Sequence, residues 1–275
     1  MSADAPITRD NMNDYLKALA KEFRRLNGTK MPAELILIGG AAILASYGFR
    51  ELTYDVDAVV IASTAMKEAI NNVSDKLSLP HGWLNADFKR TGSYSDKLLE
   101  LSVYYKTFSN IMQVRMITAE YLIAMKLMSG RRYKNDISDI YGVLWEHQKN
   151  GTPISKTAVE QAVTVLYGGL DKLPEISVGL LEKAFEDGDY ETLYNRSREG
   201  EKEAKEILVE FEEQYPNTLK TENINIVLEQ MKRKRDGKPK KESLLSRLED
   251  AKVEACKVNE ISVQASKRER NRHEH

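Results

Sequence analysis

The chain has 275 residues, of which 41% are hydrophobic and 30% are charged, and its formal net charge is −1. This composition is typical of a helix-rich protein with one large domain or two ordinary ones, and the net charge gives no indication of a nucleic-acid partner. The single cysteine, Cys256, excludes an internal disulfide and a cysteine-rich zinc site. No apolar run approaches the length of a membrane span, and the N-terminus lacks the apolar core of a signal peptide. The sequence therefore predicts a cytoplasmic protein without a membrane partner.

The first predicted elements surround a pair of glycines. Residues 11–27 have apolar side chains at helical spacing, and the apolar run at residues 35–38 predicts a buried strand. Gly39 and Gly40 follow this strand and precede a small apolar helix predicted over residues 41–47. Glycine lets backbone N–H groups approach a ligand closely, and a helix N-terminus favours anions. The pair therefore predicts a phosphate-binding site.

Two aspartates open the next apolar run. Asp55 and Asp57 are two residues apart, so on a strand their side chains point to the same face, while Val56 points to the other. Two carboxylates held close together repel each other unless a cation lies between them. Mg²⁺ fits such a position, because it takes oxygen ligands and often binds through one or two carboxylates and substrate phosphates. A phosphate-binding glycine pair beside such carboxylates predicts a site for nucleotidyl transfer.

A helix and a hairpin are predicted after this run. Residues 63–77 have helical spacing, and β-like patterns follow at residues 97–105 and 111–117. Residues 107–110 (Thr-Phe-Ser-Asn) suit the turn between the two strands of a hairpin.

Two helices then carry charged residues among apolar ones. The helix that follows Thr118 carries Lys126, which either is partly buried or extends its amine to the surface. The next helix begins at Asn135 or Asp136. Asp136 and Asp139 lie one turn apart on it, and without further information both are explained by the positive N-terminal end of the helix.

The rest of the chain is predicted to be helical. Residues 232–241 (KRKRDGKPKK) hold seven basic groups and one acid, which favours either a solvated linker or a contact with an RNA backbone. The predicted helices cover residues 155–167, 177–185, 192–214, 223–235 and 243–275.

Together these motifs resemble the nucleotidyltransferase superfamily with the DNA polymerase beta type fold. The glycine pair, the short helix and Thr53-Tyr54-Asp55-Val56-Asp57 are similar to its first motif. The helix lysine and the later Asn-Asp-x-x-Asp-Ile block, residues 135–140, are similar to a lysine followed by Arg-Asp-x-x-Asp-Leu, with Asn in place of Arg and Ile in place of Leu. The resemblance covers residues 30–145 and is closest to the AbiEii-like group, which includes toxins of toxin–antitoxin systems.

This resemblance implies an α+β fold, in which a mixed sheet is flanked by helices and followed by a helical C-terminal region. Residues 1–148 are expected to form the catalytic domain, and residues 149–275 a helical region that binds the acceptor or a partner. The implied activity is Mg²⁺-dependent transfer of NMP from an NTP to a hydroxyl group of RNA such as tRNA, of a protein or of a small molecule. A toxin role and a cognate antitoxin follow from the resemblance. The alternative is a catalytically degenerate nucleotide-binding or partner-binding protein with the same fold.

The resemblance also assigns roles to residues. Asp55 and Asp57 are the implied metal ligands, and one of Asp136 and Asp139 is an implied catalytic acid. Lys126 is expected to neutralise triphosphate charge. The implied nucleotide-binding residues are Gly39, Gly40, Thr53, Lys126 and Arg131.

Many members of the superfamily have a third carboxylate on a later strand, which can act as the base. Glu100 is the best-placed candidate here, because strand alternation puts it on the face opposite Leu99 and Leu101. A surface glutamate on a half-exposed strand is the alternative. Asp87, just after a Trp-Leu-Asn sequence that also occurs in relatives of the group, is the second candidate.

Overall fold

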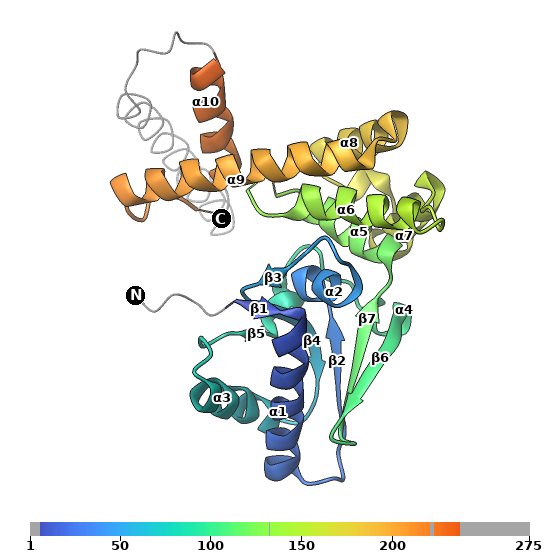
Figure 1. Cartoon of the computed structure of the whole chain (residues 1–275), viewed down its shortest axis with the longest axis vertical. Coiled ribbons are helices and arrows are strands. Elements are labelled where there is room, and N and C mark those ends of the chain that lie inside the picture. Colours follow the sequence, from blue (N-terminus) through green and yellow to red (C-terminus); the bar gives the residue numbers. More distant parts are fainter. Residues whose placement is uncertain (1–5, 132, 221–222, 237–275) are drawn as a thin grey trace, which may run out of the picture. The chain divides into compact units, whose positions relative to one another are not determined.

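The computed structural model describes residues 6–131, 133–220 and 223–236 (Figure 1). The chain forms two compact units, and the first contains the described residues up to 130 together with residues 136–195. The second contains residues 131–135 and the described residues from 196 onward, except residue 132. Helices just beyond residue 149 thus belong to the first unit, and a functional boundary at residues 148 and 149 stays a prediction. The helix predicted over residues 243–275 and the end of the basic run, residues 237–241, lie outside the described residues.

A mixed sheet forms the centre of the first unit. Its strands lie in the order β5-β4-β2-β7-β6. The pairs β2–β7 and β4–β5 are parallel, whereas β2–β4 and β6–β7 are antiparallel. A separate two-stranded sheet pairs β1 with β3. The strands are β1 (Ile7–Thr8), β2 (Ala33–Leu37), β3 (Leu52–Thr53), β4 (Val56–Ile61), β5 (Leu84–Asn85), β6 (Ser102–Phe108) and β7 (Met112–Ile117).

Helices surround this sheet and make up the C-terminal part of the described chain, so the predicted α+β class with a helical C-terminal region is confirmed (Figure 1). Within the described residues, no helix is both long and apolar enough to cross a membrane. The helices of the first unit are α1 (Arg9–Asn27), α2 (Gly39–Ser46), α3 (Ala65–Leu77), α4 (Leu98–Leu101), α5 (Ala119–Ser129), α6 (Asp136–Lys149), α7 (Lys156–Tyr167) and α8 (Glu175–Asp187). Short 3-10 turns are η1 (Asp87–Arg90) and η2 (Leu170–Lys172).

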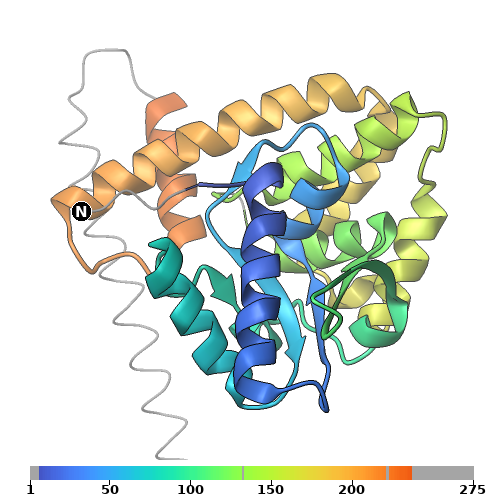
Figure 2. The same cartoon turned by 60° about the horizontal axis from the view of Figure 1, so that its bottom comes forward.

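One face of the sheet is covered by α1 and α3, which lie side by side against it (Figure 2). Along β2, Leu35 and Leu37 point to one face and Ile36 to the other, and all three are fully buried. Leu16 and Phe23 of α1 are completely buried in the same core. The register pairs Leu37 with Ala58, so the alternate position Asp57 lies on the face of the sheet opposite these two residues.

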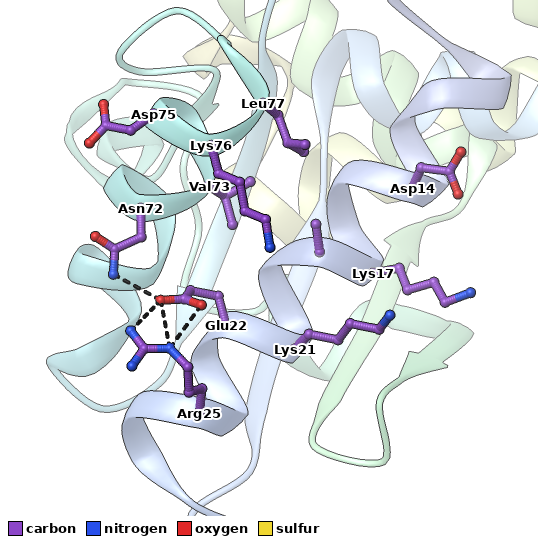
Figure 3. A pocket seen from close by; sticks show the side chains of 11 residues that line it. Asp14, Lys17, Lys21, Glu22, Arg25, Asn72, Val73, Asp75, Lys76 and Leu77 are labelled. Atoms are coloured by element: carbon purple, nitrogen blue, oxygen red, sulfur yellow. Dashed lines mark hydrogen bonds and ion pairs between the residues drawn. The ribbon is translucent and has the colours of Figure 1, made fainter.

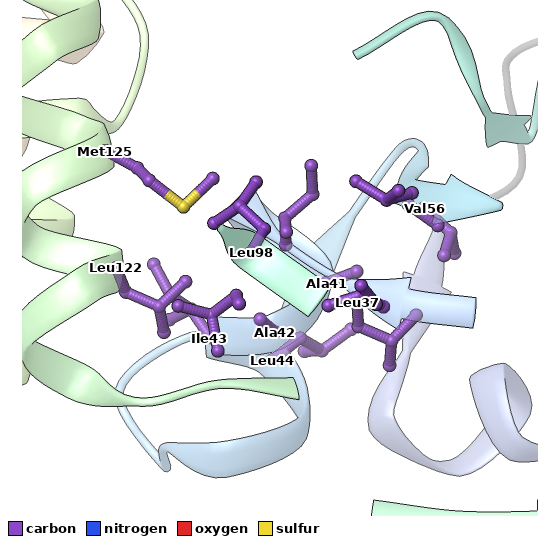
Figure 4. Packing of buried hydrophobic residues seen from close by; sticks show 14 of the residues in the cluster. Leu37, Ala41, Ala42, Ile43, Leu44, Val56, Leu98, Leu122 and Met125 are labelled. Carbon is purple, nitrogen blue, oxygen red and sulfur yellow. The ribbon is translucent and has the colours of Figure 1, made fainter. Parts of the chain in front are cut away.

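The helix α2 joins the sheet to the helices beyond it. Its four consecutive residues Ala41–Leu44 are all apolar and buried, so this part of the helix is enclosed on every side. Figure 4 shows Leu122 and Met125 of α5 pointing toward α2 and Leu98, while Ala41 and Leu37 lie in the part of the core near β4. The helix that begins with the glycine pair is therefore fixed by packing on both sides.

The strand predicted over residues 97–105 is wrong in its first half. Leu98–Leu101 form the single helical turn α4, and β6 begins only at Ser102. The backbone N–H groups at the two ends of this turn donate to carbonyls three and four residues earlier, and Leu98 alone is buried. Glu100 is exposed on a helical turn, so the strand alternation that made it the candidate base is absent. A leucine-rich segment suits a helix as well as a strand, and local hydrogen bonding decided the outcome.

The predicted hairpin is confirmed, since β6 pairs antiparallel with β7. Its turn contains Ser109 and Asn110, with φ angles of 51° and 53°. These left-handed values match the twist of a tight hairpin, although serine is an uncommon residue in this conformation.

The second unit is built around the later part of α9 (Tyr190–Gln214) and α10 (Ile224–Asp236). One of its apolar clusters contains Phe211, Tyr215, Val227 and Met231. Another contains Ala204, Leu208 and Leu228, and Tyr133 from the segment between α5 and α6 packs against it.

A close approach between α6 and Phe49 gives a test of the fold. A methyl group at Gly142 would lie 2.6 to 2.8 Å from ring atoms of Phe49, so we expect Gly142→Ala to force a rearrangement. The free energy of unfolding should fall by about 1–3 kcal/mol, less the roughly 1 kcal/mol that alanine contributes to a helix. Chemical denaturation followed by circular dichroism measures this loss.

The matched control is Gly179→Ala in α8, where nothing lies within 4 Å of the added methyl group. This variant should be neutral or more stable by up to about 1 kcal/mol. Equal effects of the two substitutions would contradict the packing of α6 on Phe49.

Candidate active site

The first glycine of the pair lies against an aspartate of the predicted metal site. Gly39 begins α2 with φ +55°, a left-handed value that favours glycine. A Cβ atom at this position would lie 3.1 Å from Oδ2 of Asp57. The start of α2 and the carboxylate of β4 are thus in close contact.

The two aspartates occupy different environments at the start of β4. Asp55 immediately precedes the strand and is exposed, Val56 is completely buried, and Asp57 is half-buried. The buried Thr53 donates its hydroxyl to the backbone carbonyl of Asp55 at 3.1 Å, and the same oxygen lies 3.5 Å from Oδ1 of Asp55. Thr53 therefore fixes the turn that carries Asp55.

An asparagine on the neighbouring strand orients Asp57. The register of β4 and β5 places Asn85 directly beside Asp57, and its Nδ2 donates to Oδ1 of Asp57 at 2.9 Å. Its own Oδ1 accepts the backbone N–H of Asp87 at 2.9 Å, which determines the orientation of the amide group. The Trp-Leu-Asn segment is visible in the sequence, but the role of Asn85 is not, because the parallel pairing of β5 with β4 has no local signal. Asp87 itself is exposed.

The second glycine of the pair lies against an arginine that the sequence analysis did not consider. A Cβ atom on Gly40 would lie 2.8 Å from Nη2 of Arg50 and 3.0 Å from Oγ1 of Thr53. The side chain of Arg50 is only 15% exposed, and its Nη1 contacts Asp139 of α6 at 2.6 Å. Its Nε donates to the carbonyl of Leu52 at 3.3 Å. The one feature of the sequence that could have drawn attention to Arg50 is its position shortly before the motif that contains Asp55 and Asp57.

Lys126 lies at the centre of a buried network of ion pairs. Its Nζ is 2.7 Å from Oδ1 of Asp136 and 2.8 Å from Oδ2 of Asp139. The side chain of Lys126 is 11% exposed, and those of Asp136 and Asp139 are 2% and 3% exposed. Arg50 completes the network on the other side of Asp139. The structure therefore brings the three motif residues Lys126, Asp136 and Asp139 together, and α6 begins at Asp136.

Two opposing effects determine the pKa of Lys126. Burial lowers it, whereas the carboxylates of Asp139 and Asp136 raise it, and the net result is a pKa above the usual 10.5. Lys126 is thus a cation throughout the physiological range.

The donor set beside the glycine pair suits Mg²⁺. Asp55 and Asp57 supply carboxylate oxygens, and the amide of Asn85 holds one of them in place. Among the residues that the structure describes, no three His, Cys, Asp or Glu side chains are grouped as a metal site. Two carboxylates supplemented by phosphate and water oxygens are a common arrangement for Mg²⁺, so the residues fit this ion.

Arg131 belongs to the second unit and is described with it, so its predicted nucleotide contact stays a prediction. A groove of 1090 Å³ runs between α1 and α3, and none of the predicted site residues lines it (Figure 3). Four basic and three acidic side chains line this groove, and within it Glu22 accepts hydrogen bonds from Arg25 and Asn72, which lower its pKa to about 2. This mixture of charges gives no preference for an anionic ligand.

A model of a known protein family matches the first part of the chain. Residues 14–150 match the model of a family described as "Nucleotidyltransferase of unknown function (DUF6036)". No curated protein and no solved structure matches the chain. The family match supports the assignment of this part of the chain to the nucleotidyltransferases, the general class that its motifs indicate.

The ion-pair network gives a test of stability. Lys126→Met leaves the buried Asp136 without its lysine and Asp139 with Arg50 alone, so the free energy of unfolding of the first unit should fall by about 3–5 kcal/mol. Adding Asp136→Asn removes one of the two buried charges and should recover part of the loss. Chemical denaturation of the single and double variants measures both effects.

The control is Lys76→Met on the exposed surface of α3, which should change the free energy of unfolding by less than about 0.5 kcal/mol. A loss of similar size in Lys76→Met and Lys126→Met would show that the network does not contribute as described.

The raised pKa of Lys126 predicts a dependence on alkaline pH. Because the folded protein holds this proton more tightly than the unfolded chain, the stabilisation is fully present below pH 10.5 and is lost as the pH rises through the folded-state pKa. Above pH 10.5, the stability of the wild-type protein should fall more steeply than that of Lys126→Met. Parallel slopes from thermal unfolding across this range would contradict the prediction.

Proposed function

We propose that the chain is a Mg²⁺-dependent nucleotidyltransferase that transfers NMP from an NTP to an acceptor hydroxyl group. The observation that carries the proposal is the close approach of Asp57 to Gly39, where Oδ2 of Asp57 lies 3.1 Å from the Cβ position of Gly39. Phosphate-binding backbone and metal-binding carboxylates must lie this close to act on the same triphosphate. The family match to nucleotidyltransferases supports the same class.

In this proposal the residues of the site bind and position the substrate. The new bond joins the acceptor oxygen to the α-phosphorus, the bond between the α-phosphorus and its bridging oxygen breaks, and pyrophosphate leaves. The acceptor proton passes to a carboxylate of the site or to solvent. Asp55 and Asp57 would hold Mg²⁺, which would supply positive charge to offset the negative charge of the triphosphate. Asn85 holds the carboxylate of Asp57 in position, and Thr53 fixes the turn that carries Asp55 by donating to its backbone carbonyl.

The acceptor is proposed from the resemblance alone. RNA such as tRNA, a protein and a small molecule are the three classes, and a labelled product distinguishes them directly. The resemblance to the AbiEii-like group extends the proposal to a cytoplasmic toxin that a cognate antitoxin restrains. Growth arrest on expression, dependent on Asp55 and Asp57 and relieved by a co-expressed partner, tests that extension.

The lack of an assigned catalytic base favours a second function, that of a nucleotide-binding or partner-binding protein without turnover. The structure removes the strand placement on which Glu100 was selected as a base, and Asn85 rather than a carboxylate lies beside Asp57. A site with two carboxylates and no assigned base is expected to bind a nucleotide even where it does not transfer it.

A transfer assay separates these functions. The full chain is incubated with Mg²⁺, each α-labelled NTP in turn, and total tRNA or cell extract. Label on an RNA, protein or small-molecule product is expected, and Asp55→Ala/Asp57→Ala should reduce it by about 1,000-fold or more, because charge neutralisation at the α-phosphorus is lost.

The matched control is Asp75→Ala, which removes an exposed aspartate on α3 and should retain full transfer. Transfer that survives the Asp55→Ala/Asp57→Ala change would refute the site assignment. Binding of NTP without transfer to any acceptor in the extract would favour the second function.

A further inference from the structure

We propose that Arg50 binds the nucleotide phosphates through Nη2, and that Lys126 is a positioning residue that holds Arg50 in place through Asp139. This inference rests on the proposed function and assigns a residue that neither the motifs nor the family match identifies. Most donors of the Arg50 guanidinium group have partners in the protein.

Three hydrogen bonds hold the guanidinium group through Nη1 and Nε. Nη1 donates to Oδ1 and Oδ2 of Asp139 at 2.8 and 2.6 Å, and Nε donates to the carbonyl of Leu52 at 3.3 Å. Within the part of the chain that the structure describes, Nη2 has no hydrogen-bond partner, and it is not among the fully buried polar atoms that lack one. Nη2 therefore offers its N–H groups to a ligand that enters from solvent.

The direction of Nη2 places it at the glycine pair. This atom lies 2.8 Å and Cζ lies 3.1 Å from the Cβ position of Gly40, in the first turn of α2. The first N–H groups of a helix have no partners within the helix, and the partial positive charge there favours anions. Arg50 thus adds charge-assisted N–H donors where the backbone already favours a phosphate.

Lys126 is less suited to this contact. Its Nζ already lies within 2.8 Å of two carboxylates, and its side chain is 11% exposed. Its amine is thus already occupied by Asp136 and Asp139, whereas Nη2 of Arg50 points away from the carboxylate that Nη1 binds. A planar guanidinium group can bind a carboxylate along one edge and a phosphate along another, which a lysine amine cannot do with the same geometry.

The test is calorimetric titration of the full chain with each NTP and with inorganic triphosphate, in the presence of Mg²⁺. Arg50→Lys should remain folded, because it keeps a cation beside Asp139. It lacks the second edge of the guanidinium group, which in the wild-type protein is available to a phosphate. Its Kd for both ligands should rise about tenfold or more, the size expected for loss of a charge-assisted hydrogen bond. Arg50→Ala should show at least the same loss if circular dichroism confirms that it folds.

Two further variants test the roles of the other residues. Arg24→Ala removes an exposed arginine of α1 and should leave both Kd values within about twofold. Lys126→Met/Asp136→Asn removes the lysine and one carboxylate and keeps the Arg50–Asp139 pair, so it should weaken binding less than Arg50→Lys does. A greater loss in that double variant than in Arg50→Lys would show that Lys126 itself contacts the phosphates.

The remaining outcomes separate this inference from the proposed function. Wild-type binding of NTP that Arg50→Lys leaves unchanged overturns the role of Arg50 and leaves the nucleotidyltransferase proposal intact. Weaker binding of NTP with unchanged binding of triphosphate places Arg50 at the base or sugar, and failure of triphosphate to bind the wild-type protein excludes the phosphate site. Failure of every NTP to bind the wild-type protein overturns both proposals.

Discussion

The buried ion pairs of Lys126 are the interaction on which the arrangement of the candidate site depends. Asp139 contacts both Lys126 and Arg50, so it links α5 and α6 to the segment that precedes β3. A buried charge is destabilising unless it is paired with an opposite charge. Removal of one residue of the network therefore leaves its partner as an unpaired buried charge, which destabilises the fold. Such a network therefore tolerates few alternative arrangements, which gives the glycine pair, Arg50 and the start of β4 a defined mutual geometry.

The glycine pair shows how one sequence feature satisfies two requirements. The sequence indicates a ligand-binding role for Gly39 and Gly40, because glycine lets the backbone approach a phosphate closely. In the structure each glycine also leaves room for a side chain, Gly39 for Asp57 and Gly40 for Arg50. Steric necessity and ligand binding are compatible here, because the side chains that occupy the space are a candidate metal ligand and a candidate phosphate-binding residue.

Local patterns predicted much of the first unit. The glycine pair, the aspartate pair and the hairpin of β6 and β7 depend on neighbours in the sequence, and the structure contains each of these elements. The segment at residues 98–101 was misassigned, because a run of leucines satisfies both helical and strand patterns. The family match agrees with the class that the motifs indicated.

Contacts between distant residues could not be predicted in the same way. Arg50 and Asp139 are separated by 89 positions, and Asn85 reaches Asp57 across 28 positions. No periodicity of a single sequence connects such positions, and only the paired strands and packed helices bring them together. The burial of Lys126 was one of two alternatives at the sequence level, whereas its two partners required the fold.

The segment between α5 and α6 has a consequence for how the chain can be divided. Residues 131–135 belong to the second unit, whereas the helices on either side of them belong to the first. Tyr133 packs against Ala204, Leu208 and Leu228, all of which a truncation after residue 195 would delete. The first unit is therefore discontinuous in sequence, and a shortened chain would expose an aromatic side chain three residues before the buried Asp136.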